Sequence, residues 1–182
     1  MNILAGSSQD IRQNLGMSSQ ISVELLSVDQ WKRLRDIRLR SLNESPSAFG
    51  GQLEVEGEFL ENQWRDKFFT LDYLVASIDE VDIALMSVET FAGDHDATCW
   101  IGGCWSDPLY RGQGAMRALF DYVDLHAKEK GWQRQGLGVW ADNDGAIAAY
   151  RAIGFENAGK YQASERQPGR FYIHMVRDSV AK

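Results

Sequence analysis

The chain of 182 residues contains few of the side chains that build disulfides and metal sites: two cysteines and three histidines. Cys99 and Cys104 are five residues apart in one apolar run, so in a strand they would face opposite sides of the sheet and form no disulfide. His95, His126 and His174 are scattered, without the ligand spacing of a zinc site. No metal site is therefore expected.

Long apolar runs and an excess of basic charge are also missing. No run reaches the roughly 18 residues that a membrane helix needs, and the N-terminus lacks the pattern of a secretory signal. The 19 basic residues face 26 acidic ones, a net charge of -7, which argues against a nucleic-acid partner. We expect a protein of the reducing cytoplasm without a nucleic-acid or membrane partner, whose acidic field suits an amine-bearing partner.

The residues that are present fit one globular domain. Hydrophobic residues make up 44% of the chain and charged residues 25%, which is ordinary for a single core. Residues 1–20 are rich in Ser, Gln, Asn and Gly without a sustained period, so we expect a poorly ordered extension before a single domain over residues 21–182. Met17 is an alternative start to Met1.

Apolar periodicity predicts that strands and helices are mixed along the chain. The first helix follows Asp29 and ends at the Ser45-Pro46 break, and the later helices stop at Gly131 and Gly154. Three antiparallel strands in a row and a helix-covered mixed sheet are the simplest arrangement. The expected strands are 21–26, 73–78, 83–91, 98–106, 137–140, 155–161 and 171–176, and the expected helices are 29–44, 53–68, 115–130 and 143–153. Along the second helix, Glu54, Glu58 and Glu61 are expected to share a solvated face.

A glycine-rich stretch at residues 109–116 lies between an apolar strand and a helix. Gly112 and Gly114 are separated by one residue and open directly into the helix, where several backbone N–H groups can converge on an anion. Taken alone, such a stretch is more often an ordinary loop than a phosphate site. The flanking sequence decides between the two.

Three segments in a fixed order resemble the GNAT superfamily of acyl-CoA-dependent N-acyltransferases. They are the strand 100–106 followed by Asp107-Pro108, the loop 111–116, and the segment 143–155. The loop matches Arg-x-x-Gly-x-Gly/Ala, although Met116 stands where the family prefers a small residue. The third segment matches Asn-x-x-Ala-x-x-Leu-Tyr with a following Gly-Phe, at Asn143, Ala146, Tyr150, Gly154 and Phe155, with Ala149 in place of leucine.

The resemblance implies an α/β (α+β) fold: a mostly antiparallel central sheet flanked by helices, with a splayed strand pair at the coenzyme A site. Acetyl-CoA would be the cosubstrate, without a metal. Gly102-Gly103 would permit the bulge that opens the strand, unless these glycines merely make room for Trp100 and Trp105. The implied cofactor-binding residues are Cys104, Trp105 and Ser106 along the pantetheine arm, Arg111, Gly112, Gln113, Gly114, Ala115 and Met116 at the pyrophosphate, and Asn143.

Tyr150 would be the general acid. A phenol with a pKa of about 10 stays protonated near neutral pH and can protonate a thiolate whose thiol pKa is about 8.5. Without the motif, Tyr150 would be read as a core aromatic of an amphipathic helix.

The general base is less clear from the sequence. Many family members carry an acidic residue at the position of Trp100. Glu89 or Asp96 can substitute, directly or through water, or the acceptor has a low pKa. We favour Glu89, because it ends a predicted strand that flanks the site.

The chain is therefore interpreted as an acetyltransferase that moves an acetyl group from acetyl-CoA to a primary amine by direct attack in a ternary complex. Neither cysteine lies where the resemblance places the reacting groups, so no acyl-enzyme is expected. A non-catalytic acyl-CoA sensor or interaction module of the same fold is the alternative. A Rossmann dinucleotide-binding protein fits the three-strand meander poorly.

The acceptor is not marked by any motif. Small-molecule and peptide amines both stay open, and the walls of the acceptor site are expected from residues 45–64 and 163–170. A homodimer is a further expectation from the resemblance, although no segment marks an interface.

Overall fold

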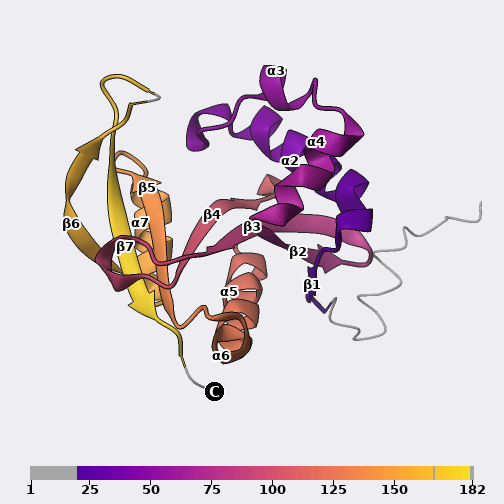
Figure 1. Ribbon diagram of the computed structural model, residues 1–182. Coiled ribbons are helices and arrows are strands. Elements are labelled where there is room, and N and C mark those ends of the chain that lie inside the picture. The colour runs from indigo at the N-terminus through magenta and orange to yellow at the C-terminus, as the bar shows by residue number, and fades with distance from the viewer. Residues whose placement is uncertain (1–19, 166, 181–182) are drawn as a thin grey trace, which may run out of the picture.

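A computed structural model describes residues 20–165 and 167–180. They contain one seven-stranded sheet and the helices that cover it (Figure 1). The strand order is β1-β2-β3-β4-β5-β7-β6. The pairing of β4 with β5 is parallel, and the other neighbours are antiparallel. This confirms the predicted mostly antiparallel sheet. The strands are β1 (Ser22–Leu25), β2 (Asp72–Ile78), β3 (Val81–Thr90), β4 (Cys99–Ser106), β5 (Arg134–Trp140), β6 (Glu156–Ala163) and β7 (Phe171–Asp178).

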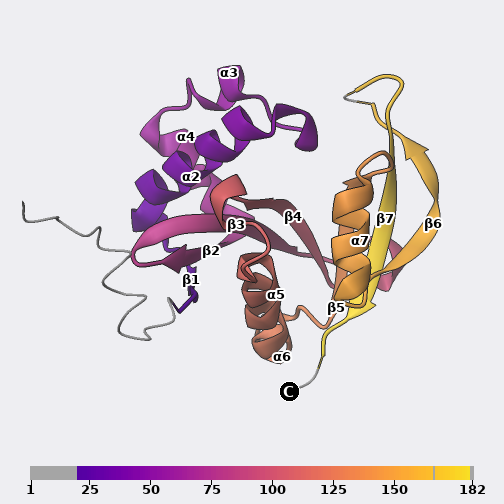
Figure 2. The same cartoon turned by 180° about the vertical axis from the view of Figure 1, so that it is seen from behind.

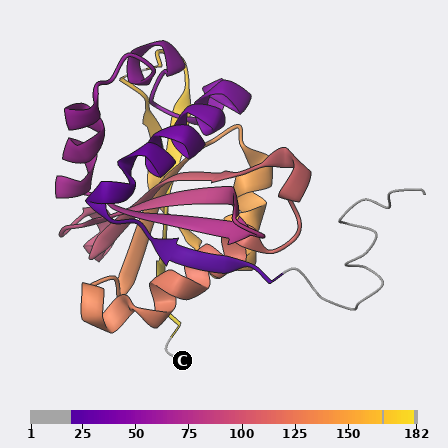
Figure 3. The same cartoon turned by 90° about the vertical axis from the view of Figure 1, so that its right-hand side faces the viewer.

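Helices cover both faces of the sheet (Figures 1 and 2). On one face lie α2 (Trp31–Glu44), α3 (Leu53–Glu56) and α4 (Glu61–Asp66), and on the other lie α5 (Ala115–Leu125), α6 (Ala127–Lys130) and α7 (Asp144–Ala152). The side view in Figure 3 shows the sheet between these two layers. As predicted, the helical stretch before residue 131 ends at Gly131 in the left-handed conformation, and Asn143 caps α7.

Two apolar cores follow from the two layers. Leu74 and Ala76 of β2 pack into the core under α5 and α7, whereas Tyr73 and Val75 pack into the core under α2 and α4. Successive side chains of a strand point to opposite faces, so a strand covered on both faces is apolar throughout. This explains why β2 and β3 read as nearly continuous hydrophobic runs.

The single helix predicted for residues 53–68 is wrong. The chain forms α3, turns at Gly57, and starts α4 after Leu60. Glu58 lies in the break between the two helices, so the predicted acidic helix face does not exist. The buried carboxylate here is Glu56, which pairs with Arg38 at 2.7 Å and with Lys67 at 3.2 Å.

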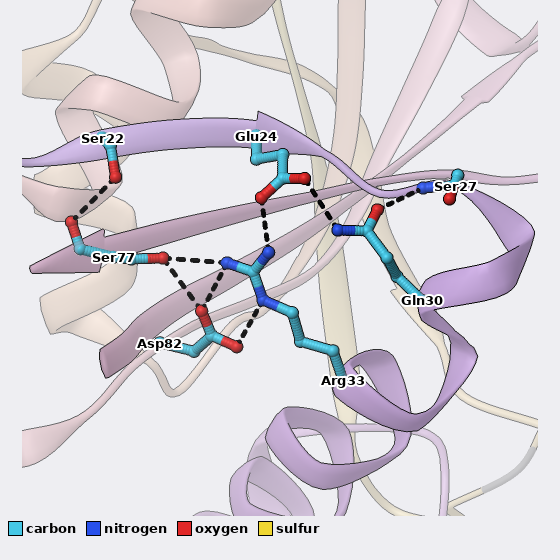
Figure 4. A network of polar contacts seen from close by, with 7 residues as sticks. All are labelled: Ser22, Glu24, Ser27, Gln30, Arg33, Ser77 and Asp82. Atoms are coloured by element: carbon cyan, nitrogen blue, oxygen red, sulfur yellow. Dashed lines mark hydrogen bonds and ion pairs between the residues drawn. The ribbon is translucent and has the colours of Figure 1, made fainter. Parts of the chain in front are cut away.

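Arg33 of α2 fastens the N-terminal strands to the helical layer (Figure 4). Its guanidinium donates to both carboxylate oxygens of Asp82, at 2.8 and 2.6 Å, to Ser77 Oγ at 3.0 Å, and to Glu24. Gln30 also donates to Glu24, at 2.7 Å. One cation thus joins β1, β2 and β3 to α2, and hydrogen bonds to the charged form raise its pKa.

A buried ion pair links β7, the last strand in the chain, to α5. Arg177 of β7 donates to Asp124 of α5 at 2.9 Å, to the Gln135 side chain of β5 at 2.9 Å, and to the Ile153 carbonyl at 2.7 Å. Gln135 also donates to Asp124, at 2.8 Å. The side chains of Asp124 and Arg177 are 4% and 5% exposed. The network therefore joins two helices and two strands inside the protein.

Two sequence predictions concern the N-terminal extension and membrane helices. The predicted N-terminal extension, residues 1–20, lies outside the described residues except for Gln20. Among the helices in residues 20–165 and 167–180, none has the length and apolar character to cross a membrane.

The buried ion pair predicts a large loss of stability for Asp124→Asn. The substitution keeps the side-chain shape but leaves the Arg177 charge without a counterion, which costs about 3 kcal/mol or more in the free energy of unfolding. Asp178→Asn is the matched control, because Asp178 pairs with Arg134 at 2.8 Å but its side chain is 77% exposed. Its loss should stay below about 1 kcal/mol. Urea denaturation measures both values, and equal losses would contradict the prediction.

Candidate active site

The site forms where β4 and β5 separate. Their parallel pairing covers only Cys99–Ile101 of β4 against Gln135–Leu137 of β5. Beyond these residues β4 stays paired with β3, and β5 stays paired with β7. The facing edges of β4 and β5 therefore open a cavity of about 970 Å³, and the predicted splayed strand pair is present.

A β-bulge bends β4 at the same place. Leu85 of β3 pairs with Trp105 and Ser87 pairs with Gly102, so Gly103 and Cys104 together oppose one residue of β3. Gly103 has a φ of 60°, which only glycine adopts without strain. The distortion thus lies at the predicted glycine pair.

Gly102 does not make room for a tryptophan, as the alternative prediction had it, whereas Gly136 of β5 does. A β-carbon at Gly102 would meet only Ser87 Oγ, at 3.3 Å. A β-carbon at Gly136 of β5 would come within 2.5 Å of the Trp100 ring. The Trp100 indole therefore lies across β5 and depends on Gly136.

The bulge also corrects the prediction for the cysteines. Cys99 and Cys104 pack against the same apolar core, under α5 and α7, because the extra residue at Gly103 resets the alternation of side chains along β4. The prediction that they face opposite sides is wrong. Both remain free thiols.

Tyr150 extends from α7 to the bulge. Its hydroxyl lies close to the Cys104 thiol, and both residues line the cavity. Burial, followed by the proximity of Cys104, raises the pKa of Tyr150 well above its ordinary value. The ring is held edge-on by Phe120 and Phe155, at centroid distances of 6.2 and 5.9 Å. Tyr150 is thus a protonated acid in a fixed position.

Asn143 places α7 at the cavity wall. Its side-chain oxygen accepts a hydrogen bond from the Ala146 N–H at 3.1 Å, which caps the first turn of the helix. Asn143 and Ala146 line the cavity together with Tyr150. The matched motif therefore lies on one side of the opening.

The glycine-rich loop lies at the other side, at the start of α5. Gly114 is the residue before the helix, with a φ of 92°, and the first turn leaves backbone N–H groups without acceptors inside the helix. Met116 is partly buried against the apolar core, so its side chain packs inward. Arg111 is exposed and bonds Glu44 at 2.8 Å and the Ser106 carbonyl at 3.1 Å.

The structure brings only some of the predicted residues together. Cys104, Asn143 and Tyr150 line one cavity. Trp105 is turned to the opposite face, where its indole N–H bonds Glu44 at 3.0 Å. Glu89 pairs with Trp100 across β3 and β4 but is not among the residues that line the cavity.

Four polar residues of the cavity were not predicted as site residues from the sequence. Asp94, Gln162, Tyr172 and His174 all line it. They come from the loop before β4, from β6 and from β7, so their spacing along the chain carries no signal. Only the strand order brings them together.

A polar connection spans the opening. The Trp140 indole N–H donates to the Ala48 carbonyl at 3.1 Å. Arg170 lies 4.1 Å from the Trp140 ring centre and donates to the Ser47 carbonyl at 2.8 Å. Residues 48–50 and 163–165 line the cavity, so both segments expected to form the acceptor walls contribute to it.

A sheet opened between a bulged strand and its parallel neighbour, with a glycine-rich helix start beside it, defines the fold of the acyl-CoA-dependent N-acyltransferases. Residues 31–155 match the family described as the Acetyltransferase (GNAT) family. The chain belongs to this family, whose members use acetyl-CoA.

Solved structures share the fold at low sequence identity. The ribosomal-protein-S18-alanine N-acetyltransferase from Escherichia coli is 17% identical with a TM-score of 0.62, and the match covers 90% of this chain and 96% of that one. A ribosomal L7/L12 alpha-N-protein acetyltransferase in complex with coenzyme A is 14% identical with a TM-score of 0.70, covering 91% and 97%. The ribosomal-protein-S5-alanine acetyltransferase from Vibrio fischeri is 15% identical with a TM-score of 0.70, covering 90% and 95%. No curated protein sequence matches the chain.

Metal ligands do not cluster in the part of the chain that the structure describes. Within residues 20–165 and 167–180 there is no group of three or more His, Cys, Asp or Glu side chains placed to hold a metal ion.

The two thiols should react slowly in the native protein. Burial raises the pKa of Cys104 to about 11 and that of Cys99 to about 12. At pH 8 only about one Cys104 side chain in 1,000 is a thiolate, against about one in four for an ordinary cysteine. Alkylation by iodoacetamide, followed by mass spectrometry, should be slow for both residues and become normal in urea. A native thiol that reacts at the unfolded rate would contradict this prediction.

Proposed function

We propose that this protein transfers an acetyl group from acetyl-CoA to a primary amine by direct attack in a ternary complex. The observation that carries the proposal is the position of Tyr150, a half-buried and protonated phenol beside Cys104, just beyond the point where β4 leaves β5. Family membership supports the acetyl donor. The raised pKa values of both cysteines argue against an acyl-enzyme.

Two features on the β4 side of the opening, the edge of β4 and the start of α5, suit two parts of coenzyme A, the pantetheine arm and the pyrophosphate. The open edge of β4 offers backbone N–H and C=O groups at Cys104, Trp105 and Ser106 to an amide-bearing arm, in the manner of an added strand. The start of α5 offers N–H groups and the positive end of a helix dipole to a pyrophosphate. We assign residues Arg111, Gly112, Gln113, Gly114, Ala115 and Met116 to the pyrophosphate and Asn143 to the arm.

Tyr150 is proposed as the general acid. Collapse of the tetrahedral intermediate breaks the C–S bond and leaves a thiolate, which needs a proton. The Tyr150 hydroxyl already lies beside a sulfur atom, that of Cys104. Because its pKa is raised, the phenol keeps its proton throughout the physiological pH range.

The acceptor is proposed to be cationic. Asp94 and Glu165 line the cavity, and none of its described lining residues is Lys or Arg. Two structural neighbours are described as acting on an alanine of a ribosomal protein and one on an α-amine. We therefore include peptides that begin with alanine beside small amines. A homodimer and a cytoplasmic location remain predictions.

Release of free thiol from acetyl-CoA, measured with a panel of amines and peptides, tests the proposal. An acetyltransferase releases thiol only with an accepted amine, and mass spectrometry then finds the acetylated product. Binding of coenzyme A without turnover would instead assign the chain as a sensor. Binding of NAD without coenzyme A would refute both functions.

Arg111 should strengthen the binding of coenzyme A. Arg111→Gln removes a charge-assisted contact to phosphate. A loss of about 1.5 kcal/mol of binding free energy raises the dissociation constant about tenfold. Arg117→Gln is the matched control, because Arg117 is exposed on α5, the helix that follows the loop, and pairs with Asp121. Its dissociation constant should change less than about twofold. Isothermal titration calorimetry measures both, and equal effects would remove Arg111 from the site.

Tyr150→Phe should slow transfer without weakening cofactor binding. Loss of the general acid lowers kcat by about 100-fold or more, whereas the ring and its contacts with Phe120 and Phe155 are kept. Tyr122→Phe is the control, since Tyr122 stacks on His126 outside the cavity. A Tyr150→Phe variant with unchanged kcat would refute the assignment.

A further inference from the structure

The transfer proposed above needs a base, and few groups in the cavity can serve. With a pKa of about 10.4, only about one lysine-like amine in 2,500 is neutral at pH 7. Cys104 and Tyr150 have raised pKa values and stay protonated, and the carboxylates of Asp94 and Glu165 are largely exposed to water. His174 is different: it lines the same cavity, yet it is only 6% exposed.

We propose that His174 accepts the proton of the acceptor ammonium group. His174 pairs across the sheet with Gly138 of β5, which also lines the cavity. A β-carbon at Gly138 would lie 3.9 Å from His174 Cδ2. Nε2 is bonded to Cδ2, so this edge of the imidazole faces the space that the missing side chain leaves at the cavity wall.

The opposite edge of the ring is held by polar groups. His174 Nδ1 lies 3.4 Å from His95 Nε2, 3.4 Å from Gln162 Nε2 and 3.8 Å from an Asp94 carboxylate oxygen. A proton on Nδ1 can be accepted by the Asp94 carboxylate or by His95 Nε2, whereas the Gln162 amide nitrogen is a donor and makes no hydrogen bond to this tautomer. With the proton on Nδ1, the neutral imidazole keeps a lone pair on Nε2 for the amine. The proposal assigns this tautomer.

Aromatic neighbours fix the plane of the ring. Trp100 packs edge-on against His174 at a centroid distance of 4.8 Å, and Tyr172 lies at 5.3 Å. Tyr172 also donates to the Gln162 side chain at 2.9 Å, which orients Gln162 beside the ring. The imidazole is therefore preorganised, as a proton acceptor in a cavity must be.

Burial favours the neutral form of His174. Burial lowers its pKa below the ordinary value of 6.5, His95 lowers it further, and Asp94 opposes the change. At pH 7 the imidazole is therefore free to accept a proton. Protonation inactivates it only as the pH falls through the lowered pKa, so the base is present throughout the neutral range.

The protons balance in this scheme. The ammonium gives one proton to His174 Nε2, and the neutral amine then forms the N–C bond at the thioester carbonyl. The C–S bond breaks, and Tyr150 gives its proton to the thiolate. The newly bonded nitrogen, which still carries an extra proton, then returns a proton to Tyr150. The proton on His174 Nε2 then leaves to solvent through the open cavity, which restores the tautomer with its proton on Nδ1.

Two acceptors that differ by one oxygen atom test the role of His174. Benzylamine is an ammonium ion at pH 7, whereas O-benzylhydroxylamine is neutral because oxygen lowers its basicity. His174→Gln should slow acetyl transfer to benzylamine about 100-fold and transfer to O-benzylhydroxylamine less than about fivefold. His126→Gln, which removes a histidine outside the cavity, should change neither rate. Equal losses with both acceptors would show a structural role and overturn the proposal.

Glu89→Gln is the competing arm of this experiment. A selective loss with benzylamine in Glu89→Gln, together with unchanged selectivity in His174→Gln, would assign the base to Glu89 and overturn the proposal. No selective loss in Glu89→Gln is the expected result, because Glu89 is not among the residues that line the cavity.

A measurement without turnover separates this inference from the proposed function. The chain has three histidines, so ¹⁵N NMR can resolve each ring, with His174→Gln as the assignment. In the coenzyme A complex at pH 7, His174 should be neutral with its proton on Nδ1, and benzylamine should shift its signals but not those of His126. An Nε2 proton, a charged ring or no shift overturns the role of His174, whether or not any amine is acetylated.

Discussion

Strands β4 and β5 share three residue pairs of parallel ladder and then separate, while each stays paired on its other edge, β4 with β3 and β5 with β7. A backbone edge left open inside a protein must find hydrogen-bond partners elsewhere. The open edge of β4 is therefore a place where an extended, amide-bearing ligand can bind. The bulge at Gly103 and the helix starts of α5 and α7 are arranged around this edge.

A sheet that opens in the middle has to be held together elsewhere. Behind the opening, the Arg177 guanidinium joins α5 to β5 and β7 through Asp124 and Gln135. Above it, Trp140 and Arg170 bind the carbonyl groups of residues 47 and 48. These contacts join the two halves of the sheet around the opening.

The sequence predicted the elements well where periodicity and capping residues agree, as at Asn143 and Gly131. The predictions were wrong where a single glycine interrupted the regular alternation or spacing of side chains. The bulge at Gly103 reversed the expected orientation of Cys104, and Gly57 divided a helix that apolar spacing had joined. Motif residues on one segment were found together, whereas His174 and Asp94 meet only through the pairing of β5 with β7 and the loop before β4, which no local pattern encodes.

The halves of the sheet on either side of the opening carry different chemical tasks. The loop proposed to hold the donor belongs to the β4 side, while Tyr150, His174 and the 163–165 wall belong to the side of β5, β6 and β7. A change in β5, β6 or β7 can therefore alter the recipient and its activation without touching the loop proposed to bind the pyrophosphate of the donor. Divergence within such a fold can proceed on one half at a time, which lets one scaffold serve many recipients.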